Sequence, residues 1–373
     1  MIENYKVIGL MSGTSLDGLD IAFCRFQKDD GRWNYEILCA DTLPYSHEWQ
    51  QRLSSLENAS AFEYAKTHAD LGHYFGRCVA DFMTNHRLQR TDVDFVSSHG
   101  HTIFHQPQIG LTTQIADPNA IAAETGLPVV ADFRTLDVAL GGQGAPLVPI
   151  GDNLLFGNYN SCLNLGGIAN ISFEKKGKRV AFDIAPCNMI LNYLSKKMDM
   201  PYDRGGAVAK SGVASDDLLK ALNSLEYYLL PYPKSLGKEW FVENFEPLFA
   251  HSSYTVRTLL ATATEHISCQ IAKTLNDNKL SSVIITGGGA FNDFLIESIH
   301  QKADCQIFIP NSLVVNYKEA MIFAFLGVLR IRGEANCLSS VTGAKASCCG
   351  GSVTGTALRD ARLRSPRIRL VEP

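Results

Sequence analysis

Residues Tyr5 to Phe23, YKVIGLMSGTSLDGLDIAF, place two apolar runs on either side of a loop of small and polar residues. Glycine tolerates positive φ, and Ser and Asp are common turn residues, so this stretch predicts a β-hairpin. Residues Ser161 to Phe173, SCLNLGGIANISF, repeat the pattern around Gly166 and Gly167. One hairpin in each half of the chain indicates that the same unit is built twice.

A second unit, an apolar β run that ends in a glycine turn, also occurs in each half, at residues 94–104 and 282–295. Residues 61–86 and 258–276 carry apolar side chains at three- and four-residue spacing, which is typical of amphipathic helices. Helices that alternate with β runs predict an α/β fold. The glycine- and proline-rich residues 141–153 predict the joint between two domains, with a ligand cleft between them.

Length and composition limit the class of protein. A chain of 373 residues is longer than one hydrophobic core usually supports, and 46% hydrophobic residues are typical of a globular protein. The formal net charge of -4 provides no cationic field, so we expect no nucleic-acid partner. Ten cysteines without a CxxC pair predict reduced thiols rather than disulfides or a metal site.

The chain carries no predicted targeting or membrane segment. Its first ten residues lack the basic, apolar and small-residue regions of a signal peptide. The apolar run Ala320 to Leu329 is shorter than the roughly 20 residues that a bilayer requires. We therefore expect a cytoplasmic protein that does not contact a membrane.

The loop of the first hairpin, Met11 to Gly18, holds two glycines, three hydroxyl residues and one carboxylate. Backbone N–H groups beside glycine approach an anion closely, so the loop could bind phosphates, with Asp17 near a Mg²⁺ ion. An ordinary polar turn accounts for the same residues. The loop alone does not decide between these interpretations.

The second glycine cluster, Thr286 to Ala290, lies between an apolar strand and a predicted helix. Its glycines would let a ribose or a flat ring approach, and the helix N-terminus would favour an anion. Tight packing of the strand against the helix is the alternative. Because GxxxxGK[ST] and GxGxxG are both absent, a nucleotide would have to bind through the two hairpins.

Candidate catalytic and binding side chains follow apolar runs. Asp183, just before Pro186, could be a general base or a helix cap. Arg134, after Asp132, could grip a carboxylate or form a structural salt bridge. Glu319 is expected to open a helix and favour its dipole.

Three histidines lie close together in SHGHTIFH, at positions 99, 101 and 105. Their spacing fits no standard zinc signature, and no cysteine or carboxylate cluster accompanies them. We expect His101 and Thr102 to offer hydrogen bonds in the cleft instead.

Eight segments in order resemble the anhydro-N-acetylmuramic acid kinase family. From the N-terminus they are MSGTSLDGLD, SHGHTIFHQP, ADFRTLDVALGGQGAPLVP, NLGGIANI, PKSLGKEWF, TGGGAFN, KEAMIFAF and SVTGA. The resemblance implies two actin/hexokinase-like (ribonuclease H-like) α/β domains, residues 1–145 and 146–345, with a cleft between them. The Arg-rich residues 346–373 lie beyond it and are interpreted as a frayed tail. The resemblance also implies phosphorylation of 1,6-anhydro-N-acetylmuramic acid by ATP with Mg²⁺, during cell-wall recycling.

The resemblance also assigns roles to residues. It places the catalytic aspartate at Asp183 and substrate contacts at Thr102, Arg134 and Asp183, with a small amino sugar and ATP as partners and a homodimer left open. The ATP-binding positions would be Gly13, Thr14, Ser15, Leu16, Asp17, Gly18, Leu19, Asp20, Gly166, Gly167, Asn170, Gly287, Gly288 and Gly289.

The chain departs from the family pattern at a few positions. The family usually has Gln at the position of His101, and DTGPGN where this chain has DIAPCN, so Ile184, Ala185 and Cys187 differ. Three other functions stay open: a kinase for another sugar or small acid, a nucleotide-binding regulatory module, and a glycosidase with two facing carboxylates. A regulatory module needs no base beside an acceptor, and a glycosidase needs no nucleotide.

Overall fold

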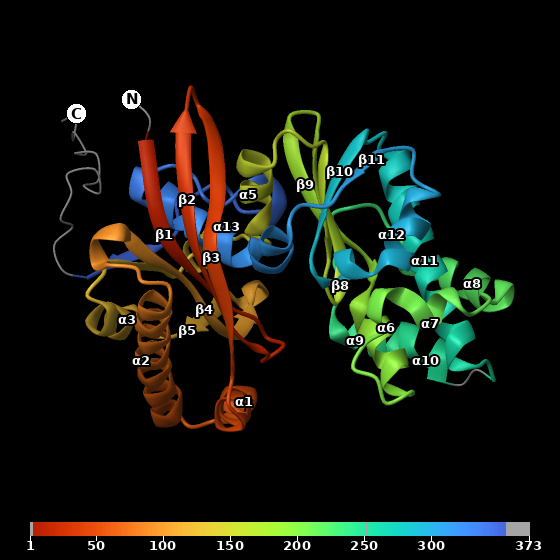
Figure 1. Cartoon of the computed structure of the whole chain (residues 1–373), viewed down its shortest axis with the longest axis horizontal. Coiled ribbons are helices and arrows are strands. Elements are labelled where there is room, and N and C mark those ends of the chain that lie inside the picture. The colour runs from red at the N-terminus through yellow and green to blue at the C-terminus, as the bar shows by residue number, and fades with distance from the viewer. Residues whose placement is uncertain (1–2, 251–252, 356–373) are drawn as a thin grey trace. The chain divides into compact units, whose positions relative to one another are not determined.

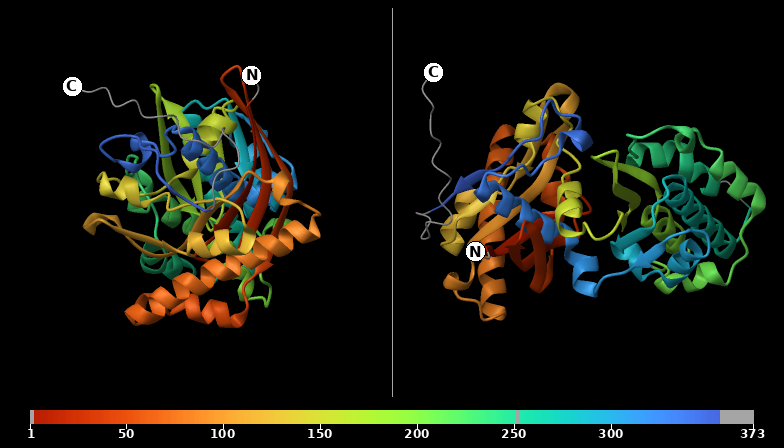
Figure 2. Two further views of the ribbon diagram at one scale, coloured as in Figure 1. Left: turned by 90° about the vertical axis from the view of Figure 1, so that its left-hand side faces the viewer. Right: turned by 90° about the horizontal axis from the view of Figure 1, so that it is seen from above.

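The computed structural model describes residues 3–250 and 253–355, which fold into two compact units (Figure 1, Figure 2). Unit 1 contains residues up to Leu155 and again from Tyr317 onward, and unit 2 contains Phe156–Asn316. These bounds differ from the expected domains 1–145 and 146–345. The chain returns to unit 1 at Tyr317, so the last long helix belongs to the first unit from that residue onward.

Unit 1 is built on a twisted sheet whose first three strands form an antiparallel meander and whose next two central strands run parallel to the first. The order is β3-β2-β1-β4-β6, with β12 antiparallel at the edge and β5 paired with the end of β4. The strands are β1 (Glu3–Ser12), β2 (Gly18–Asp29), β3 (Arg32–Pro44), β4 (Phe95–Gln106), β5 (Leu111–Ile115), β6 (Val129–Ala131) and β12 (Ser352–Thr354).

Unit 2 repeats this topology in the order β9-β8-β7-β10-β11, again with an antiparallel meander followed by two parallel strands. Both predicted hairpins are confirmed, since β1 pairs with β2 and β7 pairs with β8. The predicted duplication of the fold is therefore confirmed at the level of strand order. The strands are β7 (Ser161–Leu165), β8 (Ile168–Lys175), β9 (Lys178–Pro186), β10 (Ser282–Thr286) and β11 (Gln306–Phe308).

The predicted end of the β run at residues 94–104 is wrong. β4 continues past Gly100, which adopts φ 73°, because its second half pairs with β5 from His101↔Ile115 onward. Residues 282–295 behave as predicted, with β10 followed by a glycine turn and helix α12 (Asp293–His300).

Helices cover both faces of the unit 1 sheet. α2 begins at the N-cap Ser60, whose hydroxyl accepts from the Glu63 N–H at 3.2 Å, and its apolar face packs against the sheet. On the other face the Phe325 ring of α13 lies 5.2 Å from Phe26 and 5.0 Å from Trp33. The helices are α1 (His47–Ser54), α2 (Ala61–Asn85), α3 (Pro118–Thr125), α4 (Thr135–Ala139), α5 (Val148–Leu155), α13 (Ser312–Arg332) and α14 (Ser339–Thr342).

α13 lies close enough to β1 that only glycine fits at Gly9, where a Cβ would lie 2.0 Å from the Ala320 carbonyl oxygen. Among the described residues, α13 is the one helix long and apolar enough to cross a membrane by length and composition. The expectation that this run is too short is therefore wrong in length. Because 72% of its apolar window is buried inside the fold, α13 is a core helix.

Unit 2 is centred on α11, which is buried on most of its sides and contacts α6, α7, α8, α12 and β9. The helices are α6 (Asn188–Lys196), α7 (Ala207–Lys210), α8 (Asp216–Asn223), α9 (Lys238–Trp240), α10 (Glu246–Ala250), α11 (Val256–Asp277) and α12. Both units also contain short 3₁₀ or π turns. Those of unit 1 are η1 (Leu56–Asn58), η2 (Arg90–Asp92) and η3 (Pro107–Ile109), and those of unit 2 are η4 (Arg204–Gly206), η5 (Glu226–Leu229), η6 (Phe241–Phe245) and η7 (Gly288–Phe291).

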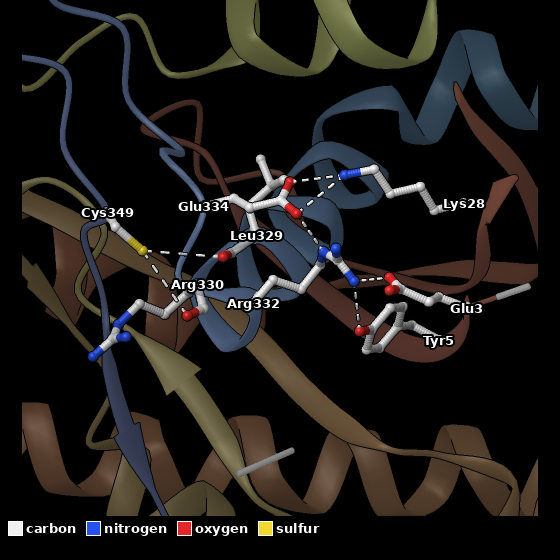
Figure 3. Close-up of polar contacts among 8 residues, drawn as sticks. All are labelled: Glu3, Tyr5, Lys28, Leu329, Arg330, Arg332, Glu334 and Cys349. Atoms are coloured by element: carbon white, nitrogen blue, oxygen red, sulfur yellow. Dashed lines mark hydrogen bonds and ion pairs between the residues drawn. The ribbon is translucent and has the colours of Figure 1, made fainter. Parts of the chain in front are cut away.

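Figure 3 shows how the end of α13 is tied to the sheet of unit 1. Arg332 pairs with Glu3 and, at 2.6 Å, with Glu334, and it donates to the Tyr5 hydroxyl at 3.1 Å. Lys28 reaches the same Glu334 carboxylate at 3.1 Å. These charges fix the turn from which the chain continues to its last described strand.

The interpretation of residues 346–373 as a frayed tail is wrong for residues 346–355. Cys348 exchanges both backbone hydrogen bonds with Cys337, and β12 pairs with β6. The Cys349 thiol points at the carbonyls of Leu329 and Arg330, at 4.0 and 3.9 Å (Figure 3). The arginines at 359, 362, 364, 367 and 369 lie outside the described residues. The ten cysteines are free thiols in the structure.

Candidate active site

The turn between β1 and β2 is a compact, partly exposed hairpin in unit 1. The Leu16 N–H donates to the Gly13 carbonyl at 3.3 Å, and Leu16 itself adopts φ 61°. Thr14, Ser15 and Asp17 are exposed. Hydroxyl and carboxylate groups on this turn are therefore available to a ligand.

Ser12, at the end of β1, connects this turn to buried side chains of unit 1. Its hydroxyl lies 2.6 Å from the Tyr45 hydroxyl and 2.8 Å from Nδ1 of His101, and all three side chains are buried. Burial lowers the pKa of His101 to about 4, so its ring is neutral at pH 7. His101 therefore holds the hairpin, a structural role that differs from the expected contact with a ligand.

Three of the predicted nucleotide glycines have space where a side chain would go. A Cβ at Gly13 would meet only the Ser15 hydroxyl, at 3.5 Å, and one at Gly288 only the Asn188 amide, at 3.8 Å. A Cβ at Gly167 would meet nothing within 4 Å. The fold does not require glycine at these positions, so a ligand that approaches the backbone would explain them.

Other predicted glycines are explained by packing. Gly287 adopts φ 81°. Added Cβ atoms would lie 2.4 Å from the Leu43 carbonyl oxygen at Gly18, 2.5 Å from Asn164 Oδ1 at Gly287 and 2.6 Å from Leu165 Cβ at Gly289. Tight packing, the alternative considered for the second cluster, therefore holds for part of it. Gly166 is intermediate, with 3.2 Å to the Asn164 amide.

A cavity of about 520 Å³ opens beside this second cluster in unit 2. Gly288 and Gly289 line it together with Tyr202 and Phe291, which are 56% and 49% exposed. Exposed aromatic rings beside a bare backbone suit a flat heterocycle. The lining residues are Asn188, Leu191, Asn192, Tyr202, Asp203, Arg204, Gly205, Gly288, Gly289, Phe291 and Asn292.

Most of this lining was missed in the sequence. Tyr202 and Arg204 come from the η4 region, Phe291 from η7 and Asn188 from α6, so separate segments meet only in the folded unit. Asn188 was visible as part of DIAPCN. No local pattern marks the other three.

Asp183 lies on β9 and is half-buried. Its carboxylate accepts the Leu236 N–H at 2.8 Å, its own N–H donates to Lys234, and the Tyr227 hydroxyl donates to its carbonyl at 2.7 Å. Burial raises the pKa of Asp183, and the Leu236 bond opposes that shift. The helix-cap alternative fails because Cys187 occupies the N-cap of α6.

The three departures after Asp183 are part of the core. Ile184, Ala185 and Cys187 are 3%, 0% and 0% exposed and lie in the main hydrophobic cluster of unit 2. The Cys187 N–H still donates to the Gly167 carbonyl at 2.8 Å. Apolar burial therefore accounts for these side chains, while the strand keeps Asp183 in place.

Unit 1 contains a second cavity, of about 510 Å³, beside the middle of β4, strand β5 and the end of β6. His99, Thr113 and Gln114 line it, and each has a buried polar atom without a hydrogen-bond partner among the described residues: Nδ1, Oγ1 and Oε1. Buried polar groups are costly without partners, so this cavity suits a polar ligand. The lining residues are Tyr64, Ala65, His68, His99, Gly100, Thr112, Thr113, Gln114, Ala116, Pro118, Ala131, Asp132, Thr135 and Ser352.

Arg134 lies beside this cavity. Its Nε and Nη2 donate to Nε2 of His99 at 3.1 and 3.0 Å, and its Nη1 donates to the Gly144 carbonyl at 2.7 Å. Burial, followed by the charge of Arg134, lowers the pKa of His99 well below its usual value. The partners of Arg134 are thus a neutral ring and a carbonyl rather than the salt-bridge alternative, and the charge of Glu319 acts on the guanidinium without an ion pair between these two described side chains.

Other predicted residues lie at the edges of this region. Thr102 Oγ1 accepts from the Gln114 amide at 3.3 Å, and Asp132, at φ 63°, accepts from the Thr135 hydroxyl at 2.5 Å. Glu319 opens a helix as expected: α13 joins two helices across a kink at Tyr317, where φ and ψ are non-helical, and Glu319 lies in the first turn of the second of them.

Asp17, the residue expected near Mg²⁺, is not part of the group of possible metal ligands that lie closest together. Among the described residues, the one set of three metal-ligand side chains is Asp137, Cys337 and Cys348, whose ligand atoms lie within 4.8 Å of one another. The three histidines form no such set. Asp17 is exposed, and its charge contributes to the raised pKa of nearby Asp20, after burial.

The two units share one strand order, so the chain is a two-domain α/β protein with a duplicated fold; unit 2 carries a cavity beside its second glycine cluster and an oriented carboxylate, Asp183. A family model described as anhydro-N-acetylmuramic acid kinase matches residues 5–356, and the chain belongs to this family.

Curated relatives agree with this assignment. Anhydro-N-acetylmuramic acid kinase of Aliivibrio fischeri is 36% identical over 91% of this chain and 96% of its own length. A protein of that name from Bacillus cereus is 33% identical over 93% and 98%. That from Vibrio cholerae is 35% identical over 92% and 96%.

Proposed function

We propose that the chain is a cytoplasmic kinase that uses ATP and Mg²⁺ to phosphorylate 1,6-anhydro-N-acetylmuramic acid while water opens its anhydro bridge, in peptidoglycan recycling. The product is N-acetylmuramic acid 6-phosphate, with ADP. Membership of the family supports this reaction. The observation that carries the proposal is Asp183, a half-buried carboxylate that strand β9 and the Leu236 N–H hold in one orientation.

In the proposed reaction Asp183 acts on water. The carboxylate accepts a proton from the water whose oxygen bonds to the anomeric carbon, and the bond from that carbon to O6 breaks. O6 then bonds to the γ-phosphorus as the bond from that phosphorus to ADP breaks. The raised pKa of Asp183 makes it a stronger base than an ordinary aspartate.

Each unit, taken by itself, offers groups of the kind that bind a nucleotide. The Gly13 and Gly167 turns offer open backbone to phosphates, and the 520 Å³ cavity of unit 2 offers Tyr202 and Phe291 to the adenine. Asp17 and Asp20 supply the carboxylate oxygens that Mg²⁺ prefers, and the ion would neutralise phosphate charge.

The acceptor would bind at the cavity of unit 1. Muramic acid carries a lactyl carboxylate, and Arg134 presents a guanidinium to that class of anion. The unpartnered atoms of His99, Thr113 and Gln114 include both possible donors and acceptors, which suits a sugar with hydroxyl and acetamido groups. Thr102, beside Gln114, is the further acceptor contact.

Asp183→Asn tests the proposed base. The amide keeps the size of the side chain and can still accept the Leu236 N–H, but it cannot accept a proton. We expect ATP affinity to stay near wild type and turnover to fall by at least about 10²-fold. Asp81→Asn, at an exposed carboxylate on α2, is the matched control and should leave turnover unchanged. Turnover above about a tenth of wild type in Asp183→Asn would assign the base elsewhere.

A further inference from the structure

Asp137 is a buried carboxylate one helical turn after Arg134, on α4, with no exposed surface. Its Oδ2 accepts the Gly144 N–H at 2.8 Å. Its Oδ1 accepts the Thr342 hydroxyl at 2.8 Å and the Cys337 thiol at 3.0 Å. Three donors from three segments of unit 1 thus converge on one side chain.

Gly144 connects this carboxylate to Arg134. Its N–H binds Asp137, while its carbonyl accepts Arg134 Nη1 at 2.7 Å. The residue adopts φ 65°, a conformation that favours glycine, and a Cβ there would lie 2.7 Å from Val138 Cγ2. Asp137 therefore anchors the backbone of the residue whose carbonyl orients one side of the guanidinium.

The same contacts argue against a metal at the Asp137, Cys337 and Cys348 group. Both carboxylate oxygens already accept hydrogen bonds, and the Cys337 sulfur is a donor to one of them, which requires a protonated thiol. Burial, then the hydrogen bond and charge of Asp137, raises the pKa of the Cys337 thiol. The cluster is complete as a hydrogen-bond network.

We propose that Asp137 is a positioning residue for acceptor binding: through Gly144 it holds the Arg134 guanidinium in the orientation that receives the acceptor's carboxylate. The inference rests on the proposed role of Arg134. Asp137 touches neither substrate and acts only through the loop. Its loss should therefore weaken acceptor binding while leaving intact the groups proposed for the nucleotide, the Gly13 and Gly167 turns and the cavity of unit 2.

The substitution Asp137→Asn is informative because the Asp137 side chain is the acceptor in each of its three hydrogen bonds. An amide nitrogen must face at least one donor, so one contact is lost whichever way the amide turns. We expect KM for the anhydro sugar to rise by about 10-fold or more, with KM for ATP changed less than about twofold. Asp94→Asn, which alters another carboxylate of unit 1 bound to a backbone N–H at 2.8 Å, controls for general destabilisation and should spare both constants.

A double-mutant cycle with Arg134→Lys tests the route. If Asp137 acts through Arg134, the sugar KM of the double variant should match that of the more severe single variant. Multiplying effects would overturn the inference. If Arg134→Lys raises the sugar KM strongly and Asp137→Asn does not, only the positioning role of Asp137 is overturned. If Arg134→Lys leaves the sugar KM unchanged, the proposed role of Arg134 is overturned as well.

Two milder variants keep the test open if Asp137→Asn does not fold. Cys337→Val removes one donor to the carboxylate, while Cys337→Ser restores a hydroxyl donor at the same position. We expect the sugar KM to rise several-fold in Cys337→Val and to return toward wild type in Cys337→Ser. Equal sugar KM values in these two folded variants would contradict the proposal.

Discussion

The guanidinium of Arg134 donates two hydrogen bonds to a single ring nitrogen, Nε2 of His99, at 3.1 and 3.0 Å. An imidazole that accepts at Nε2 carries its proton on Nδ1 and is neutral. His99 therefore orients the arginine without compensating its charge. The Phe323 ring packs 4.5 Å from the His99 ring and limits its movement.

The first prediction concerns this pair. His99→Ala frees one side of the guanidinium, so KM for the anhydro sugar should rise by about 10-fold, while KM for ATP stays near wild type. Steady-state kinetics with each substrate varied in turn would measure both. His68→Ala, which alters another histidine lining the same cavity but away from Arg134, should have the smaller effect. Equal effects would show that the pair has no special role.

The second prediction separates ligand glycines from packing glycines. Gly13→Val and Gly288→Val add bulk where the chain has space, so their unfolding midpoints should stay near wild type while ATP affinity falls by about 10-fold or more. Calorimetric titration and thermal melting measure the two quantities. Gly289→Val is the control, because its Cβ would meet Leu165 at 2.6 Å and should lower the melting temperature. Normal ATP binding by folded Gly13→Val and Gly288→Val would exclude these turns from the nucleotide site.

Some parts of the fold and of the candidate site could be predicted from local sequence patterns, and others could not. The hairpins depend on local turn chemistry, and Asp183 on a strand that ends at a proline, so both were recognisable. The cavity of unit 2 joins residues near 188, 202 and 290, and only the folded backbone brings those segments together. The same limit applies to the domain bounds, since the return of residues 317–355 to unit 1 depends on contacts far apart in the chain.

His101 and Glu319 illustrate a second limit. The sequence places His101 among possible ligand contacts, but its depth behind Ser12 depends on the register between β1 and β4. Glu319 marks the start of the helix that follows the kink at Tyr317, as the sequence predicts, but the helical segment from Ser312 that precedes the kink was not predicted. Burial and helix bounds are set by tertiary contacts that no local pattern records.

The third prediction is a pH dependence of catalysis. A general base must be deprotonated, so activity falls as pH drops through its pKa. Because burial raises the pKa of Asp183, the acid limb of the kcat profile should lie above the ordinary aspartate value of about 3.9. The residual activity of Asp183→Asn should lack this limb. The same acid limb in wild type and Asp183→Asn would assign it to another group.

The fourth prediction is a pH dependence of stability. Burial lowers the pKa of His266 to about 3, and its ring bonds Asn223 at 2.7 Å and Tyr228 at 2.8 Å. The unfolded chain binds a proton near pH 6.5 and the folded protein does not, so stability falls as pH drops from about 6.5 toward the folded pKa. One such group contributes a slope of about 1.4 kcal/mol per pH unit in this window.

Urea unfolding at pH 7, 6 and 5 would measure this slope. His266→Gln removes the titrating group and should give a shallower dependence, even if it lowers stability at pH 7. His300→Gln, at an exposed histidine, should leave the slope unchanged. A slope that is the same in wild type and His266→Gln would mean that this ring is not held neutral in the folded state.

The most direct test of the proposed reaction is ADP release with 1,6-anhydro-N-acetylmuramic acid, compared with N-acetylmuramic acid, N-acetylglucosamine and glucose at equal concentration. The account predicts that ADP forms rapidly only with the anhydro sugar, in step with a product phosphorylated at O6 and bearing a new anomeric hydroxyl. Asp183→Asn should lose that release by at least about 10²-fold. Comparable ADP release with the ordinary sugars, or a phosphorylated product that retains the anhydro bridge, would contradict the account.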